Sequence, residues 1–192
     1  MKITSARFLT GAVTPAQYPD HPVPEFAFFG KSNTGKSSLI NMLTGRHGLV
    51  KTGAKPGMTQ QVNFFLINEA FCLTDLPGVG YSYLPGAVRR ALLPMISQYC
   101  VSRENLRAIF YLLDLRREIG DEELDTIAQL GARGVPVLLV GTKEDKLGRN
   151  DLIKTVRRWS EFFGLSEENL FITSSSKKVG RDKLLSRIAS LV

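Results

Sequence analysis

The chain has 192 residues, of which 43% are hydrophobic, and a formal net charge of +7 at pH 7. That length supports one well-buried core and is too short for two comfortable domains, so we expect a single domain over residues 1–192. No apolar run reaches about 18 residues and no secretory leader pattern is present, which indicates neither a membrane-spanning helix nor secretion. We therefore expect a soluble, cytoplasmic monomer, whose positive charge reflects either an anionic partner or a generally basic surface.

The expected elements begin with an irregular segment. Residues 1–24 carry Pro15, Pro19, Pro22 and Pro24 with little periodicity, which predicts an extended arm packed along a core of residues 25–192. In chain order, six apolar runs then predict strands: Phe26 to Phe29, Gln61 to Ile67, Phe71 to Thr74, Ala108 to Leu113, Pro136 to Val140 and Leu170 to Ile172. Apolar residues at spacings of three and four predict five helices: Leu39 to Leu43, Val88 to Tyr99, Glu122 to Leu130, Leu152 to Phe163 and Lys183 to Leu191.

This alternation predicts a three-layer α/β fold with helices on both faces of a mixed, mainly parallel, six-stranded sheet. Between Ile67 and Phe71 there is room only for a tight turn, so the two strands that it joins must pair antiparallel and supply one antiparallel edge strand. The stretch from Arg46 to Gln60 contains glycines and a proline, and it is long enough to be a functional or a mobile loop.

The segment between the first expected strand and the first expected helix has the spacing of a phosphate-binding P-loop, Gly-x4-Gly-Lys-Ser. The P-loop and the residue after it are Gly30, Lys31, Ser32, Asn33, Thr34, Gly35, Lys36, Ser37 and Ser38. The glycines let the backbone curl around an anion, and the amides and the helix N-terminus offer unpaired donors. We expect Lys36 to reach the terminal phosphates and Ser37 to offer its hydroxyl to Mg2+. A P-loop by itself leaves kinases, ATPases and GTPases open.

Two further segments are candidates for contacts with the metal and the terminal phosphate. Asp75-Leu76-Pro77-Gly78 ends the third expected strand, where the Asp75 carboxylate can hold the Mg2+ shell and the Gly78 amide can meet the phosphate. Thr59, preceded by Gly57 and Met58, is a candidate second hydroxyl for Mg2+. Such a contact would couple the metal and the phosphate to the order of that loop.

Base selection is expected from Thr142-Lys143-Glu144-Asp145, which follows the strand Pro136 to Val140 at its carboxyl end. A carboxylate at Asp145 can accept hydrogen bonds from the ring NH and the exocyclic amine of guanine, a donor pair that adenine lacks. The stem of Lys143 can cover the base plane. The amides of Thr173-Ser174-Ser175-Ser176 are candidates to meet the guanine carbonyl, although such a cluster is also an ordinary helix-capping sequence.

In this order the segments resemble those of the EngB (YihA/YsxC) family of translation-factor-related GTPases. The likeness also includes Lys55 to Gln60, Asn63 to Phe65 and Gly80-Tyr81, and it covers nearly the whole chain from about Ala6. The resemblance implies a GTPase that binds GTP or GDP with Mg2+ and assists assembly of the large ribosomal subunit in bacteria, with a link to cell division and septation. It implies the precursor of that subunit and ribosomal RNA as partners. Lys31 stands where the family usually has arginine.

The candidate catalytic residues are Lys36, Thr59 and Gly78. Val79 follows Gly78 where signalling GTPases carry a glutamine that orients the attacking water, and a valine cannot orient water. We therefore expect slow hydrolysis, with the P-loop, Lys36 and Mg2+ stabilising charge. In related GTPases a bound K+ can replace an arginine finger beside an asparagine such as Asn33, so Asn33 is either a K+ ligand or a residue that shapes the turn.

Several alternatives stay open. Arg89, Arg90, Arg116 and Arg117 can be arginine fingers, RNA contacts or solvated charges. A P-loop kinase is a second candidate function, although an arginine-rich lid is not evident and a guanine motif would be gratuitous. A third is an RNA-binding module with a vestigial nucleotide pocket, which would bind RNA equally in the GTP, GDP and empty states.

Overall fold

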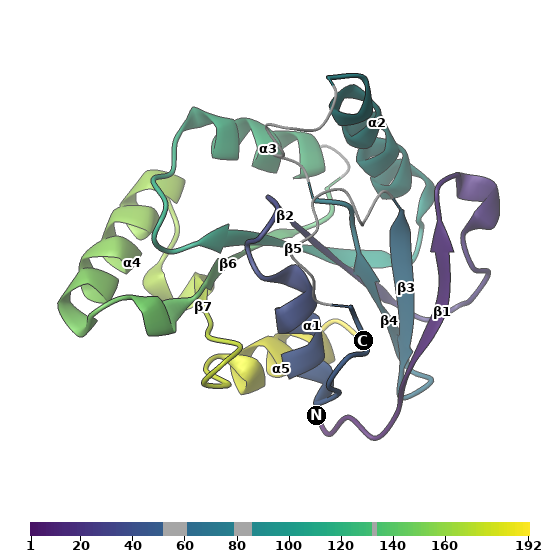
Figure 1. Cartoon of the computed structure of the whole chain (residues 1–192), viewed down its shortest axis with the longest axis horizontal. Coiled ribbons are helices and arrows are strands. Elements are labelled where there is room, and N and C mark those ends of the chain that lie inside the picture. Colours follow the sequence, from purple (N-terminus) through teal and green to yellow (C-terminus); the bar gives the residue numbers. More distant parts are fainter. Residues whose placement is uncertain (52–60, 79–85, 132–133) are drawn as a thin grey trace.

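The computed structural model describes residues 1–51, 61–78, 86–131 and 134–192, and for residues 86–93 it describes the backbone alone. A seven-stranded sheet runs through the middle of the molecule in the order β1-β3-β4-β2-β5-β6-β7 (Figure 1). The strands are β1 (Ala6–Ala12), β2 (Glu25–Gly30), β3 (Val62–Ile67), β4 (Phe71–Asp75), β5 (Leu106–Asp114), β6 (Val137–Thr142) and β7 (Phe171–Ile172). The pairs β1–β3 and β3–β4 are antiparallel, and the other neighbours are parallel.

The α/β fold class expected from the sequence is confirmed, but the expected sheet was one strand too small. Residues Ala6–Ala12, which we assigned to the extended arm, form β1 and pair with β3, so the sheet has two antiparallel pairings and β1 is one of its two edge strands. The sequence gives β1 little signal, because its register shifts between Phe8 and Thr10 and this interrupts the alternation of buried and exposed side chains. Its partner β3 also lies about 50 residues away along the chain, beyond the reach of local pattern.

Helices cover both faces of the sheet, as expected (Figure 1). On one face lie α1 (Lys36–Thr44) and α5 (Arg181–Ala189), whose buried side chains include Leu39, Leu43, Leu184 and Ile188. On the other face lie α2 (Gly86–Ser102), α3 (Asp121–Gly131) and α4 (Arg149–Phe163), which contribute Ile96, Tyr99, Leu130 and Trp159 to a second cluster. The short 3-10 helices are η1 (Pro15–Gln17), η2 (Glu144–Lys146) and η3 (Glu167–Asn169).

The strand that leads into the P-loop is buried on both sides. Every residue of β2 is buried, and Phe28 packs into the α1–α5 cluster whereas Phe29 packs into the α2–α4 cluster. A continuous apolar run is typical of a central strand with helices on both faces. In the part of the chain that the structure describes, no helix is both long enough and apolar enough to cross a bilayer.

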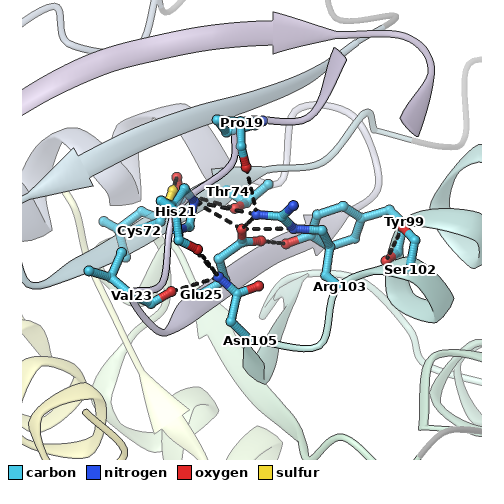
Figure 2. Close-up of polar contacts among 11 residues, drawn as sticks. Pro19, His21, Val23, Glu25, Cys72, Thr74, Tyr99, Ser102, Arg103 and Asn105 are labelled. Atoms are coloured by element: carbon cyan, nitrogen blue, oxygen red, sulfur yellow. Dashed lines mark hydrogen bonds and ion pairs between the residues drawn. The ribbon is translucent and has the colours of Figure 1, made fainter. Parts of the chain in front are cut away.

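A buried carboxylate anchors the first residue of β2. Glu25 is fully buried, and its Oε2 accepts a hydrogen bond from the Tyr99 hydroxyl at 2.8 Å (Figure 2). Its Oε1 accepts one from Arg103 Nε at 2.9 Å and another from Arg103 Nη2, and His21 Nε2 lies 3.1 Å from the same oxygen. Burial alone would raise the pKa of Glu25, but the hydrogen bonds from His21, Arg103 and Tyr99 outweigh burial and lower it.

The same cluster holds the N-terminal arm in place. Arg103 Nη2 donates to the carbonyl of Pro19 at 3.1 Å, and Asn105 Nδ2 donates to the carbonyl of Val23 at 2.7 Å (Figure 2). These donors satisfy carbonyls in residues 18–24, the part of the arm that has no helix or strand of its own. The arm, the end of α2 and the starts of β2 and β5 are thereby joined around Glu25.

We expect Glu25→Gln to destabilise the protein by about 3 kcal/mol, because it leaves the largely buried guanidinium of Arg103, whose side chain is 13% exposed, without a charged partner. The matched control is Glu69→Gln, which breaks the ion pair between Arg7 and Glu69, whose side chains are 57% and 63% exposed. That change should cost far less than Glu25→Gln, because solvent screens an exposed ion pair. Urea unfolding monitored by Trp159 fluorescence measures both.

The role of Glu25 can also be tested through the pH dependence of the unfolding free energy. Because the folded pKa of Glu25 lies below its unfolded value, its contribution to stability is present above that unfolded value, near 4.5, and is lost as pH falls below it. The unfolding free energy of the wild type should therefore fall more steeply with pH below about 4.5 than that of Glu25→Gln. Equal slopes, or equal losses in Glu25→Gln and Glu69→Gln, would contradict this role of Glu25.

Candidate nucleotide-binding site

The motif-bearing segments all follow the carboxyl ends of strands. The P-loop follows β2, Asp75 ends β4, Thr142 ends β6 and Thr173 comes directly after β7. These four strands are parallel to one another through the central sheet, so their carboxyl ends lie along one edge. Ligands bind at this edge in open α/β sheets. The structure thus brings together segments that lie up to about 140 residues apart in sequence.

The P-loop backbone adopts conformations that suit its residue types. Gly35, immediately before α1, has φ 105°, and Asn33 has φ 63°, both in the left-handed region. Glycine and asparagine tolerate this region better than other residues. A Cβ atom on Gly30 would lie 2.7 Å from the carbonyl oxygen of Leu112 in β5, so the loop leaves β2 pressed against its neighbour. The loop then enters α1 with the first helical amides free of intrahelical partners.

Two consecutive P-loop carbonyls are held from the end of β6. Thr142 Oγ1 donates to the carbonyl of Thr34 at 2.7 Å, and Lys143 Nζ donates to the carbonyl of Asn33 at 2.6 Å. In a trans peptide the N–H of the next residue points opposite to the C=O, so the Gly35 amide points away from β6. The base-selection segment therefore fixes the orientation of the phosphate loop.

We expected Lys31 among the nucleotide-contacting residues, but its ammonium contacts helix α3. Lys31 Nζ lies 2.8 Å from Glu122 Oε2 and 2.9 Å from Glu123 Oε1 at the start of that helix. Burial lowers the pKa of Lys31, but the hydrogen bonds that it donates to the two glutamates outweigh burial and raise it above its usual value. The Lys31 side chain thus connects the P-loop to α3, so that only the backbone of Lys31 is left to contact a nucleotide.

Asp75 and Gly78 pack against the P-loop beside Lys36. The Asp75 side chain is buried, and its Oδ1 has no hydrogen-bond partner among the described residues. Burial raises the pKa of Asp75, and the positive charge of Lys36 opposes that rise only in part. A Cβ on Gly78 would lie 3.1 Å from Lys36 Nζ and 3.4 Å from the Gly30 carbonyl oxygen. The chain after β4 therefore passes directly over the start of the loop.

These residues fit a magnesium ion held together with a nucleotide. A buried carboxylate oxygen without a partner is costly unless a cation or donor reaches it. Mg2+ prefers oxygen ligands and usually takes one or two from the protein and the rest from phosphates and water. Asp75 and the hydroxyl of Ser37 at the start of α1 supply such oxygens. Among the described residues no group of three or more His, Cys, Asp or Glu forms a metal cage.

The expected guanine-selecting residues meet each other across β6 and β7. Ser174 Oγ donates to Asp145 Oδ1 at 2.6 Å and lies 3.0 Å from Ser176 Oγ. The Glu144 amide donates to the Thr173 carbonyl at 3.0 Å, which joins the two loops through their backbones. The hydrogen bond from Ser174 lowers the pKa of Asp145, so the carboxylate is ionised and oriented at neutral pH. Each carboxylate oxygen still has lone-pair capacity for a base.

Sequence reasoning missed Asp114. This residue ends β5, pairs in register with Thr142 and is 3% exposed. Its Oδ2 lies 3.0 Å from Lys143 Nζ and accepts a hydrogen bond from Arg116 Nη2 at 2.7 Å. The available signal was a charged residue directly after the buried run that we ended at Leu113.

Gly57, Met58, Thr59 and Val79 lie outside the described residues, so what we expect of them stays a prediction.

Comparison with known proteins agrees with this geometry. Residues 25–143 match a family model described as 50S ribosome-binding GTPase. The probable GTP-binding protein EngB of Treponema denticola is 46% identical over 212 residues, covering 100% of each chain. EngB of Geobacter metallireducens is 42% identical over 188 residues, covering 98% of this chain and 92% of its own. The chain belongs to the EngB family of GTP-binding proteins. The resemblance seen in the sequence is thereby confirmed.

Solved structures agree on the fold of this EngB family member. A crystal structure of a probable GTP-binding protein engB superposes with a TM-score of 0.72 at 22% identity, covering 87% of this chain and 97% of its own. Aquifex aeolicus Era bound to GDP and aluminium fluoride superposes with a TM-score of 0.70 at 23% identity, covering 88% and 57%. These solved structures thus share the fold of the family to which the chain belongs.

We expect Asp145→Asn to move base preference from guanine toward xanthine, because an amide in place of the carboxylate offers a donor where guanine also offers donors. Affinity for GDP should fall by about a hundredfold or more, and affinity for XDP should rise relative to it. Equilibrium titration with fluorescent GDP and XDP measures the ratio. The matched control is Asp182→Asn on α5, whose side chain is 98% exposed and which should bind like the wild type. An unchanged GDP-to-XDP ratio in Asp145→Asn would refute the assignment.

Proposed function

We propose that this EngB family member is a GTP-driven switch that hydrolyses GTP slowly with Mg2+ and acts in assembly of the large ribosomal subunit. The proposal rests on the hydrogen bonds that join the base-selection segment to the P-loop. In these, Thr142 and Lys143 donate to the carbonyls of Thr34 and Asn33. A site built this way reads the base and the phosphates of one nucleotide together. The link to cell division and septation rests on family resemblance.

Nucleotide binding divides among three groups of residues. The P-loop amides and the N-terminus of α1 receive the phosphates, with the ammonium of Lys36 beside them. Asp145, oriented by Ser174, accepts the guanine donors, and the stem of Lys143 covers the base plane. Asp75, Ser37 and Thr59 are the residues that would hold Mg2+, through water at Asp75 and Thr59. When bound, Mg2+ supplies positive charge that neutralises the oxygens of the β- and γ-phosphates.

In this proposal hydrolysis is slow because the chain stabilises charge without orienting water. The Lys36 ammonium and the Gly78 amide are the groups proposed to stabilise the oxygens on which negative charge collects, and Gly78 lies beside both Lys36 Nζ and the Gly30 carbonyl. Val79 offers no group that positions the attacking water. A K+ ion beside Asn33 is the proposed substitute for an arginine finger. Arg116 is engaged by Asp114 in this structure, which leaves it a weaker candidate for that role.

The proposed partner is ribosomal RNA in the precursor of the large subunit. A net charge of +7 favours a polyanionic partner, because Lys and Arg contacts to phosphates release condensed counterions. The matching family model is itself described as ribosome-binding. Era, which shares this fold with a TM-score of 0.68, has been crystallised with MgGDPNP and nucleotides 1506–1542 of 16S ribosomal RNA, so the fold is compatible with an RNA ligand.

Cosedimentation with large-subunit precursors tests the proposal. The fraction bound should differ several-fold between a non-hydrolysable GTP analogue and GDP, because a switch must bind its target unequally in the two states. Lys36→Ala is the control, since loss of the terminal-phosphate contact should remove the difference. Equal binding with the analogue, with GDP and without nucleotide would overturn the proposal in favour of an RNA-binding module. Transfer of the γ-phosphate to an acceptor other than water would favour a kinase.

Potassium dependence is tested by GTP hydrolysis in K+ and Na+ buffers of equal ionic strength. The rate should be several-fold higher in K+, because the cation takes the charge-stabilising place of an arginine. Asn33→Gly removes the amide while keeping a residue that tolerates φ 63°, so this variant should hydrolyse at one rate in both salts. Equal wild-type rates in the two salts would end the potassium hypothesis and leave Asn33 as a residue that shapes the turn.

A further inference from the structure

Asp114 lies where the phosphate site and the base site meet. It is the last residue of β5, and parallel pairing with β6 places it opposite Thr142, one residue before Lys143. Its side chain is almost completely buried, and it faces Lys143 across the strand ends. The family motifs that we matched in the sequence do not include this residue. Its position is a consequence of strand register.

The Asp114 carboxylate receives four donors. Oδ1 accepts from the Arg116 amide at 3.1 Å and from Arg116 Nε at 2.9 Å. Oδ2 accepts from Arg116 Nη2 at 2.7 Å and lies 3.0 Å from Lys143 Nζ. Burial alone would raise the pKa of Asp114, but the donors of Arg116 and Lys143 hold it well below its usual range. Asp114 therefore stays a fixed negative charge throughout the physiological pH range.

The Lys143 ammonium has two partners, and the Lys143 backbone has a left-handed conformation. Its ammonium donates to the Asn33 carbonyl at 2.6 Å and pairs with Asp114 at 3.0 Å, while its backbone is left-handed with φ 63°. The Lys143 side chain is 29% exposed, so without a second partner the ammonium could rotate into water. A flexible four-carbon stem is positioned only when its charged end has a fixed counter-charge. Asp114 supplies that charge from a rigid strand end.

We infer that Asp114 is a positioning residue of the nucleotide site: it fixes Lys143, and through Lys143 it holds the P-loop at Asn33 and the wall that covers the base. Arg116 in turn fixes the Asp114 carboxylate through two parallel hydrogen bonds. This inference rests on the proposed function, because it assumes that a guanine nucleotide lies against Lys143. The inference adds to the site a residue, Asp114, that does not contact the nucleotide itself. By positioning Lys143, Asp114 affects the binding of both the base and the phosphates.

The test is a double-mutant cycle on GDP affinity with Asp114→Asn and Lys143→Met. The asparagine keeps the size of the side chain but removes its charge and turns a donor toward Arg116 or Lys143. The methionine keeps an unbranched apolar stem without the ammonium. Fluorescent GDP titration should show a loss of affinity of about tenfold to a hundredfold in Asp114→Asn, mostly through faster dissociation. In the Lys143→Met background the same change should have little further effect.

A second readout separates positioning from a merely structural role. Asp114→Asn should weaken GDP and IDP equally, because Lys143 does not read the exocyclic amine, whereas variants of Asp145 should change the GDP-to-IDP ratio. A general loss of stability would lower the melting temperature equally with and without Lys143, and it would leave the affinity effects multiplicative. Asp182→Asn is the matched exposed control and should bind GDP like the wild type.

The results test the role of Asp114 and the proposed function separately. If Asp114→Asn binds GDP like the wild type, or if the losses in Asp114→Asn and Lys143→Met multiply, the inference is wrong. If Asp114→Asn does not fold, Asp114→Glu takes its place in the cycle. That variant keeps the charge one methylene further out and should show a smaller loss that again disappears in Lys143→Met. A wild-type protein that does not prefer GDP to ADP would overturn the proposed function itself, independently of Asp114.

Discussion

The contact on which the site depends is the pair of hydrogen bonds from the end of β6 to the P-loop carbonyls. Thr142 and Lys143, which are consecutive residues, reach Thr34 and Asn33, which are also consecutive. Because the two pairs lie at the carboxyl ends of β2 and β6, which are parallel strands of one sheet, the contact exists only when β2, β5 and β6 are in register. The proposed base-binding and phosphate-binding segments are therefore joined directly, so a nucleotide bound at one would be positioned for the other.

The strand β2 is fixed at its two ends by different chemistry. At its start, Glu25 is buried and satisfied by Arg103, Tyr99 and His21, so that the arm and the end of α2 are held on it (Figure 2). At its end, the chain becomes the P-loop and is held by hydrogen bonds to backbone carbonyls. The first set of contacts stabilises the fold, whereas the second shapes a surface that remains open to a ligand. Both are needed to hold the P-loop still.

Satisfied and unsatisfied polar groups distinguish the parts of the site. The carboxylates of Asp114 and Asp145, like that of Glu25 at the other end of β2, all have hydrogen-bond donors within the protein, and their pKa values are held below the usual range. Asp75 is different, because its buried oxygen lacks a partner among the described residues and its pKa is raised. A bound cation would relieve such a carboxylate, which is why Asp75 is the proposed ligand of Mg2+.

The sequence by itself determined the class of the fold and predicted the chemistry of the site. The P-loop, Asp75 to Gly78 and Thr142 to Asp145 were recognisable because each is a short contiguous segment whose residue types follow from what it binds. The strands and helices of the core were recognisable because apolar periodicity is local. Tertiary structure decided what depends on register between distant segments. It made Ala6–Ala12 the edge strand of the sheet, it turned Lys31 toward Glu122 and Glu123, and it set Asp114 against Lys143. Each of these contacts joins residues from 29 to about 90 positions apart, and no local pattern encodes such a distance.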